Sequence, residues 1–98
     1  MESDHESSVL DDAQKIIEGA RQTEYGPPSE SFGRIAQMWS AYLGIHIGVH
    51  DVALMMVLLK TSRARTGVLA TGQPQRDSLV DIAGYAGCSD LCRDQSHK

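Results

Sequence analysis

Two aspartates and a tyrosine near the C-terminus are the residues best placed to do chemistry. Asp77, Asp81 and Tyr85 recur at intervals of four, so on a helix their side chains rise along one face. Two carboxylates one turn apart can approach a divalent cation or accept hydrogen bonds from a ribose. The structural alternative is that the carboxylates complement a helix dipole and that Tyr85 is half-buried.

A basic cluster follows the most apolar stretch of the chain. Lys60 and Arg63 are one helical turn apart, and Arg65 comes two residues later. An ammonium group and a guanidinium fork at this spacing would suit a phosphate. Two structural alternatives stay open: the cations complement a helix C-terminus, or Lys60 or Arg63 pairs with Asp77 or Asp81 across the fold.

Aromatic side chains and a further arginine lie earlier in the chain. Arg21 and Tyr25 belong to a polar segment that ends in Gly26, Pro27 and Pro28, and Trp39 falls in the next helical stretch. Arg21 would add a charge to a phosphate site, and Tyr25 or Trp39 could stack on a base. The alternative is a turn whose glycine and prolines merely end a helix.

The histidines and cysteines do not make a convincing metal site. His46 and His50 have the spacing of helical ligands, but Gly48 lies between them in a connecting segment. Cys88 and Cys92 are separated by three residues, which matches neither a redox motif nor a complete zinc set. No metal site is therefore predicted, and the cysteines are expected to be reduced thiols.

Length and charge narrow the classes of function. A domain of 98 residues exposes much of its surface when alone, so oligomerisation would help it. A net charge of −4 and a pI near 5.4 argue against nucleic acid as a partner. The longest apolar run, residues 52–59, is too short to cross a membrane, and the N-terminus does not look like a secretory signal. We expect a cytoplasmic protein.

Periodicity and turn signals predict an all-α fold. Residues 9–93 should form a single domain between an acidic N-terminal tail, residues 1–8, and a short tail, residues 94–98. Helices are expected over residues 9–23, 29–44, 50–65 and 75–92. Ser7 or Ser8 should cap the first and Ser29 the second, and the Asp51 carboxylate suits the N-terminus of the third. Residues 67–75 are expected to be a loop with room for a short strand at 68–70. The third helix is apolar on every side and should lie at the centre of a small antiparallel four-helix bundle.

Several motifs together resemble a family of small proteins of unknown function common in phages and actinobacteria. They are Tyr25-Gly26-Pro27, Phe32-x-x-Ile35-Ala36-x-x-Trp39, residues 51–56, Lys60-x-x-Arg63 and Asp77-x-x-x-Asp81-x-x-Gly84-Tyr85. The chain is also distantly similar to the MazG-like all-α nucleoside triphosphate pyrophosphohydrolases. The latter resemblance implies an oligomeric bundle whose acidic residues hold magnesium on two helices. In this chain, Lys60 to Arg63 lie where the first acidic pair is expected. The second acidic pair, Asp77 and Asp81, is separated by three residues instead of two.

These observations lead to three hypotheses. The first is a phage-type, homo-oligomeric protein that binds a nucleotide or a nucleotide-derived, even cyclic, signal without needing a cofactor, and so acts as an anti-defence sponge in an infected or lysogenic host. Its ligand-binding residues would be Arg21, Tyr25, Trp39, Lys60, Arg63, Asp77, Asp81 and Tyr85. The second is a Mg²⁺-dependent pyrophosphohydrolase using Asp77 and Asp81, with Glu24 or Glu30 as possible helpers. The third is a protein-interaction module.

Overall fold

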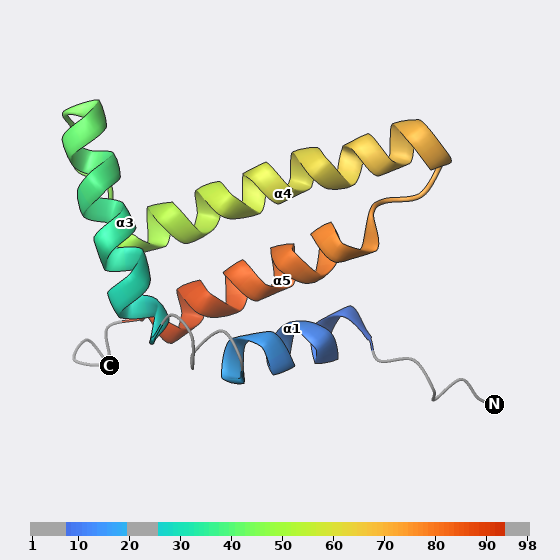
Figure 1. The fold of residues 1–98 in the computed structure, drawn as a ribbon, viewed down its shortest axis with the longest axis horizontal. Coiled ribbons are helices and arrows are strands. Elements are labelled where there is room, and N and C mark those ends of the chain that lie inside the picture. The colour runs from blue at the N-terminus through green and yellow to red at the C-terminus, as the bar shows by residue number, and fades with distance from the viewer. Residues whose placement is uncertain (1–7, 20–25, 94–98) are drawn as a thin grey trace.

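The chain folds into helices that differ in length and in how many neighbours they have. The computed structural model describes residues 8–19 and 26–93 (Figure 1). The helices are α1 (Val9–Glu18), α3 (Pro28–Leu43), α4 (Val49–Thr71) and α5 (Arg76–Leu91). No strand occurs in this part of the chain, which confirms the all-α class. None of its helices combines the length and apolarity needed to cross a bilayer.

The first two helices begin and end at residues with clear capping chemistry. Ser8 caps α1, as expected, because its hydroxyl accepts the backbone N–H of Asp11 at 3.0 Å. α1 ends at Glu18, earlier than predicted, and residues 20–23 of the predicted helix lie outside the described residues. α3 begins at Pro28 rather than after a cap at Ser29, because proline is pre-organised for the first helical position. It ends at Gly44, whose φ of 74° is left-handed.

α4 is longer than the sequence suggested. It begins at Val49, where the Asp51 carboxylate accepts the Gly48 N–H at 2.9 Å, as the predicted role of Asp51 requires. It then continues through residues 67–71, so the predicted loop and possible strand there are wrong. Gly67 does not break the helix; an added Cβ would lie 2.6 Å from the backbone nitrogen of Gln75. The glycine therefore permits a close approach of the following loop.

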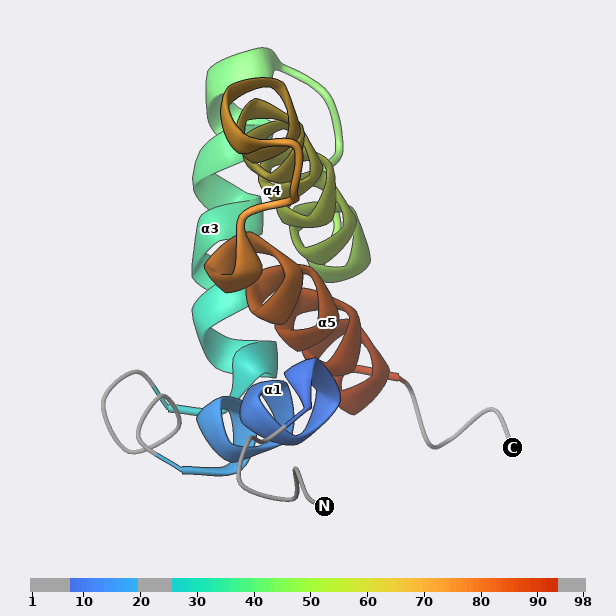
Figure 2. The same cartoon turned by 90° about the vertical axis from the view of Figure 1, so that its right-hand side faces the viewer.

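The helix at the centre is α5, not α4. Among the described helices, α5 contacts α1, α3 and α4, whereas α4 packs on α3 and α5 only. Viewed along the long axis, α1, α5 and α4 follow one another as layers (Figure 2). α3 stands across one end of α4 and α5 instead of lying along them, so the helices do not share one axis direction (Figure 1). The predicted central position of α4 is therefore wrong, and the molecule is elongated, 48 × 30 × 27 Å.

The core lies where α3 crosses the other helices. Ile17, Phe32, Val52 and Cys88 come from all of the described helices and are at most 8% exposed. Half-buried side chains, among them Trp39 and Tyr85, pack around this cluster. The α3 crossing thus fixes the aromatic end of α5, while the other end of α5 is held by α1 and α4 alone.

Candidate functional site

One face of α5 carries most of the side chains whose chemistry suits ligand binding or catalysis. Asp77, Asp81, Gly84, Tyr85 and Cys88 recur at intervals of three and four, so they lie along one face of the helix. They line adjoining hollows that share wall residues from one to the next. We call this line of hollows the α5 strip. From Asp77 to Cys88 it covers about 16 Å of helix.

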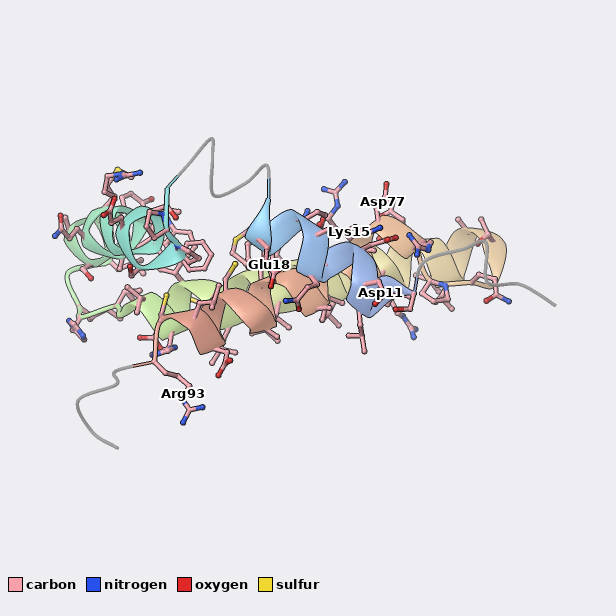
Figure 3. All side chains as sticks on the ribbon, turned by 90° about the horizontal axis from the view of Figure 1, so that it is seen from below. Asp11, Lys15, Glu18, Asp77 and Arg93 are labelled. Carbon is pink, nitrogen blue, oxygen red and sulfur yellow. The ribbon has the colours of Figure 1, made fainter. Side chains whose placement is uncertain are left out.

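The first end of the α5 strip is polar and open. It is a hollow of about 330 Å³ between α1 and α5. Its lining residues are Asp12, Ile16, Arg76, Asp77, Val80 and Asp81. Arg76 Nη2 lies 2.8 Å from Asp12 Oδ2 and so joins the two helices. Asp77 is exposed and points away from the ribbons (Figure 3).

An ion pair connects this polar end to α4. Lys60 Nζ lies 3.1 Å from Asp81 Oδ2, and the two side chains are 21% and 32% exposed. One of the structural alternatives for these residues, a pair across the fold, is therefore confirmed for Lys60 and Asp81. Partial burial strengthens such a pair relative to one in open water. Any anion that binds Lys60 must compete with the Asp81 carboxylate.

The second end of the strip is apolar and aromatic. Tyr85 and Cys88 help to line a cavity of about 130 Å³ together with Pro28, Phe32 and Met56. The rings of Phe32 and Tyr85 are stacked, with centroids 6.1 Å apart and planes at 29°. Asp81, Gly84, Tyr85 and Cys88 also line the narrow hollow that links the two ends. The strip therefore passes from charged to aromatic along one helix face.

The structure brings together half of the residues proposed for ligand binding. Lys60, Asp77, Asp81 and Tyr85 all lie on or beside the strip. Arg63 is exposed on α4 one turn after Lys60. Trp39 instead packs on the core from α3. The other two proposed residues, Arg21 and Tyr25, lie outside the described residues, as does Glu24.

Sequence reasoning missed three contributors to the strip. Asp12 and Arg76 form the wall of the polar hollow, and Phe32 forms the aromatic end. Asp12 stands four residues before Ile16, at the border of the apolar stripe of α1. That position was a usable signal, because residues bordering an apolar stripe rim the surface that the helix packs against. Its pairing with Arg76 joins residues far apart in the sequence and could not be foreseen.

The described carboxylates do not fit a magnesium ion. Within residues 8–19 and 26–93, no three aspartate, glutamate, histidine or cysteine side chains gather closely enough to hold a metal. Asp12 and Asp81 each face a cation of another helix. Magnesium requires several oxygen ligands in near-octahedral array, and these paired carboxylates do not supply them.

Neither Cys88 nor Cys92 is bridged to another described cysteine. Cys88 is buried beside the aromatic end of the strip, and Cys92 follows α5. Burial raises the pKa of the Cys92 thiol above its ordinary value. A thiol with a raised pKa is protonated at neutral pH and is a poor nucleophile. Cys92 therefore lacks the features of a reactive centre, and burial shields the Cys88 thiol.

Comparison with known proteins identifies the family of the chain and two relatives. Residues 8–93 match the family described as a domain of unknown function, DUF6378. The chain belongs to the DUF6378 family. It is 46% identical over 81 residues to the Gene 55 protein of Mycobacterium phage D29, covering 83% of this chain and 50% of that protein. The Gene 55 protein of Mycobacterium phage L5 is also 46% identical over 81 residues, covering 82% and 49%.

These relatives make the DUF6378 chain a member of a phage protein family, which confirms that part of the predicted resemblance. The chain spans about half the length of the curated relatives it matches. No solved structure matches it.

Proposed function

We propose that this DUF6378 chain binds a nucleotide-type small molecule along the α5 strip and retains it without cleaving it. The observation that supports the proposal is the continuity of the strip. One helix face joins the Lys60–Asp81 pair to the Phe32–Tyr85 stack. A nucleotide has the same two parts, a charged phosphate end and a flat aromatic end.

The residues have separate roles in this proposal. Lys60 and Arg63 receive the phosphates, because a guanidinium fork and an ammonium group suit phosphate oxygens. Asp77 or Asp81 accepts hydrogen bonds from ribose hydroxyls or from the base edge. Tyr85 provides an apolar ring for the base, in place of the stacking first assigned to Tyr25 or Trp39.

The size of the hollows decides how the ligand lies. Drug-sized ligands occupy pockets of about 300–1,000 Å³. The aromatic cavity is about 130 Å³ and is too small alone, whereas the polar hollow is about 330 Å³. The ligand therefore lies along the strip, with its base at the entrance to the aromatic cavity. Since the relatives are phage proteins, such a binder could sequester a nucleotide-derived signal of the host's defence.

Ligand retention tests this proposal. The purified protein is incubated with magnesium and a panel of linear, cyclic and ADP-ribose-derived nucleotides, and the free small molecules are chromatographed before and after heat denaturation. We expect one class to be depleted and then released intact. Failure to deplete any of them would overturn the proposal and favour a protein-interaction module.

Two variants locate the site on the strip. Arg63→Ala should weaken binding by about 10-fold or more, since a hydrogen bond to a charged group contributes about 1.5–3 kcal/mol. Arg34→Ala is the matched control, because Arg34 is also exposed but lies on α3. Binding that is unchanged by Arg63→Ala would show that the phosphate site is elsewhere.

Metal-dependent hydrolysis is the second candidate function. The observation in its favour is that Asp12 joins Asp77 and Asp81 around one hollow. The ion pairs of Asp12 and Asp81 weigh against it, because both carboxylates would have to leave their cations. New products in the same chromatography, dependent on magnesium and lost in Asp81→Ala, would establish the hydrolase and overturn the binder.

A further inference from the structure

α4 has a second face that no other described helix covers. Leu54, Leu58 and Leu69 are 53%, 68% and 72% exposed on it. In Figure 1, α5 and α1 lie on one side of α4, and its other long side has no neighbouring helix. Large apolar side chains gathered on one face indicate an interaction surface.

The exposed residues form a regular line. Asp51, Met55, Leu58, Ser62, Arg65 and Leu69 follow one another at spacings of four, three, four, three and four, and all are exposed. We call this line the outer stripe. Alternating spacings of three and four are those of a coiled-coil seam, which lets one helix pack along another. Met55, Leu58 and Leu69 supply apolar side chains at these positions, and the other members are polar. The outer stripe thus has the spacing of a helix–helix interface with both apolar and charged contacts.

The charges of the outer stripe indicate its partner. The acidic residue Asp51 stands at one end, Arg65 lies near the other, and the residues between them are uncharged. Two copies lying antiparallel bring the Asp51 end of each beside the Arg65 end of the other. A parallel pair would set like charges together. This self-complementarity is what a two-fold symmetric interface requires.

We infer that two copies of this chain pair through their outer stripes, with the two α4 helices antiparallel and Leu58 and Ser62 near the crossing point. Leu58 of each copy then packs against the other α4, and Asp51 of each copy faces Arg65 of the other. The α5 strip lies on the packed side of α4, so each copy keeps it. The inference is independent of the proposed nucleotide site.

Molar mass in solution tests the pairing. By light scattering over a wide range of protein concentrations, the wild-type chain should reach about twice 10.7 kDa. Leu58→Glu should remain a monomer with unchanged helix content by circular dichroism. Leu91→Glu is the control, because Leu91 is 52% exposed on α5, away from the stripe, and should leave the dimer intact. A monomeric wild type, or a dimeric Leu58→Glu, would overturn the inference.

A charge exchange tests the direction. Arg65→Asp should weaken dimerisation at least several-fold, and Asp51→Arg/Arg65→Asp should restore it. Circular dichroism accompanies each variant, because Asp51 also caps α4. If the double variant shows no recovery while its helix content is intact, the antiparallel pairing is wrong.

Cross-linking gives a second measure of direction that does not depend on charge. With a bis-maleimide that spans about 12 Å, Ser62→Cys should form covalent dimers, because the Asp51–Arg65 register places the two copies of position 62 about 12 Å apart along the axis. Leu69→Cys should not, because in the same register the two copies of that residue would be about 33 Å apart. The wild type reports any reaction of Cys88 and Cys92. Cross-linking at both positions would indicate parallel helices and overturn the inference.

Discussion

The two faces of α4 both carry apolar side chains, but they differ in how far those side chains are buried. On the inner face, Val52 and Ala53 are fully buried and Ala64 is 7% exposed. On the outer face, the larger side chains Leu54 and Leu58 are more than half exposed. An apolar residue is thus no guarantee of a partner within its own chain. Apolarity on every side of α4 indicated that both faces are to be covered, and the helices described in residues 8–19 and 26–93 cover only one of them.

The same substitution on each face would produce the largest contrast. Val52→Glu should unfold the chain, because an unpaired buried charge costs several kcal/mol, comparable with the stability of a small domain. Leu58→Glu should leave the helices intact, because its side chain is 68% exposed. Circular dichroism and urea denaturation at one fixed protein concentration would compare them. A well-folded Val52→Glu protein would refute the inner-face assignment.

A substitution at Gly67 should have an intermediate effect. It tests how closely the loop after α4 approaches the packed side of that helix. Alanine normally stabilises a helix relative to glycine. Here an added Cβ would lie 2.6 Å from Gln75 N and 2.9 Å from Gln73 O. Gly67→Ala should therefore lower the free energy of unfolding by about 1–3 kcal/mol, as overpacking does.

Gly33→Ala is the matched control for Gly67→Ala. Gly33 lies inside α3, and nothing lies within 4 Å of the position of its added Cβ. This substitution should raise the free energy of unfolding by about 0.5–1 kcal/mol through helix propensity alone. If urea denaturation finds both substitutions stabilising, α4 and the following loop do not approach as closely as described.

The smallest effect is expected for the ion pair at the edge of the inner face. Asp81→Asn removes one charge of the partly buried Lys60–Asp81 pair and should cost about 1 kcal/mol at low salt. Asp90→Asn should cost less, because the Arg93–Asp90 pair is about 70% exposed on both sides. Urea denaturation at two salt concentrations measures both. If both substitutions lower the free energy of unfolding equally, the partial burial of the Lys60–Asp81 pair does not strengthen it.

Much of the fold was predictable because its signals are local. The cap at Ser8, the carboxylate at Asp51, the left-handed Gly44 and the helix Arg76–Leu91 each depend on neighbours in the sequence. The prediction failed at residues 67–71, where glycine suggested a loop. The helix continues there because α4 packs against the following loop, and packing overrides propensity.

The candidate site was predictable only in part. The spacing of Asp77, Asp81 and Tyr85 placed them on one helix face, and a pair between Lys60 and Asp81 was one of the alternatives considered. The roles of Asp12 and Phe32 were not visible, since each meets α5 from a distant part of the chain. Trp39 was one of two candidates for base stacking, and the structure places it half-buried against the core, apart from the α5 strip.

The sequence by itself determined the helical class, the caps and the periodic faces, because these depend on residues within a few turns of one another. The tertiary structure alone decided that α5 rather than α4 is central and that α3 crosses the end. It also decided which carboxylates meet which cations. The physical reason is that the spacing of apolar residues shows which faces of a helix are to be buried. Long-range packing, within one chain or between two, determines which segment buries each face.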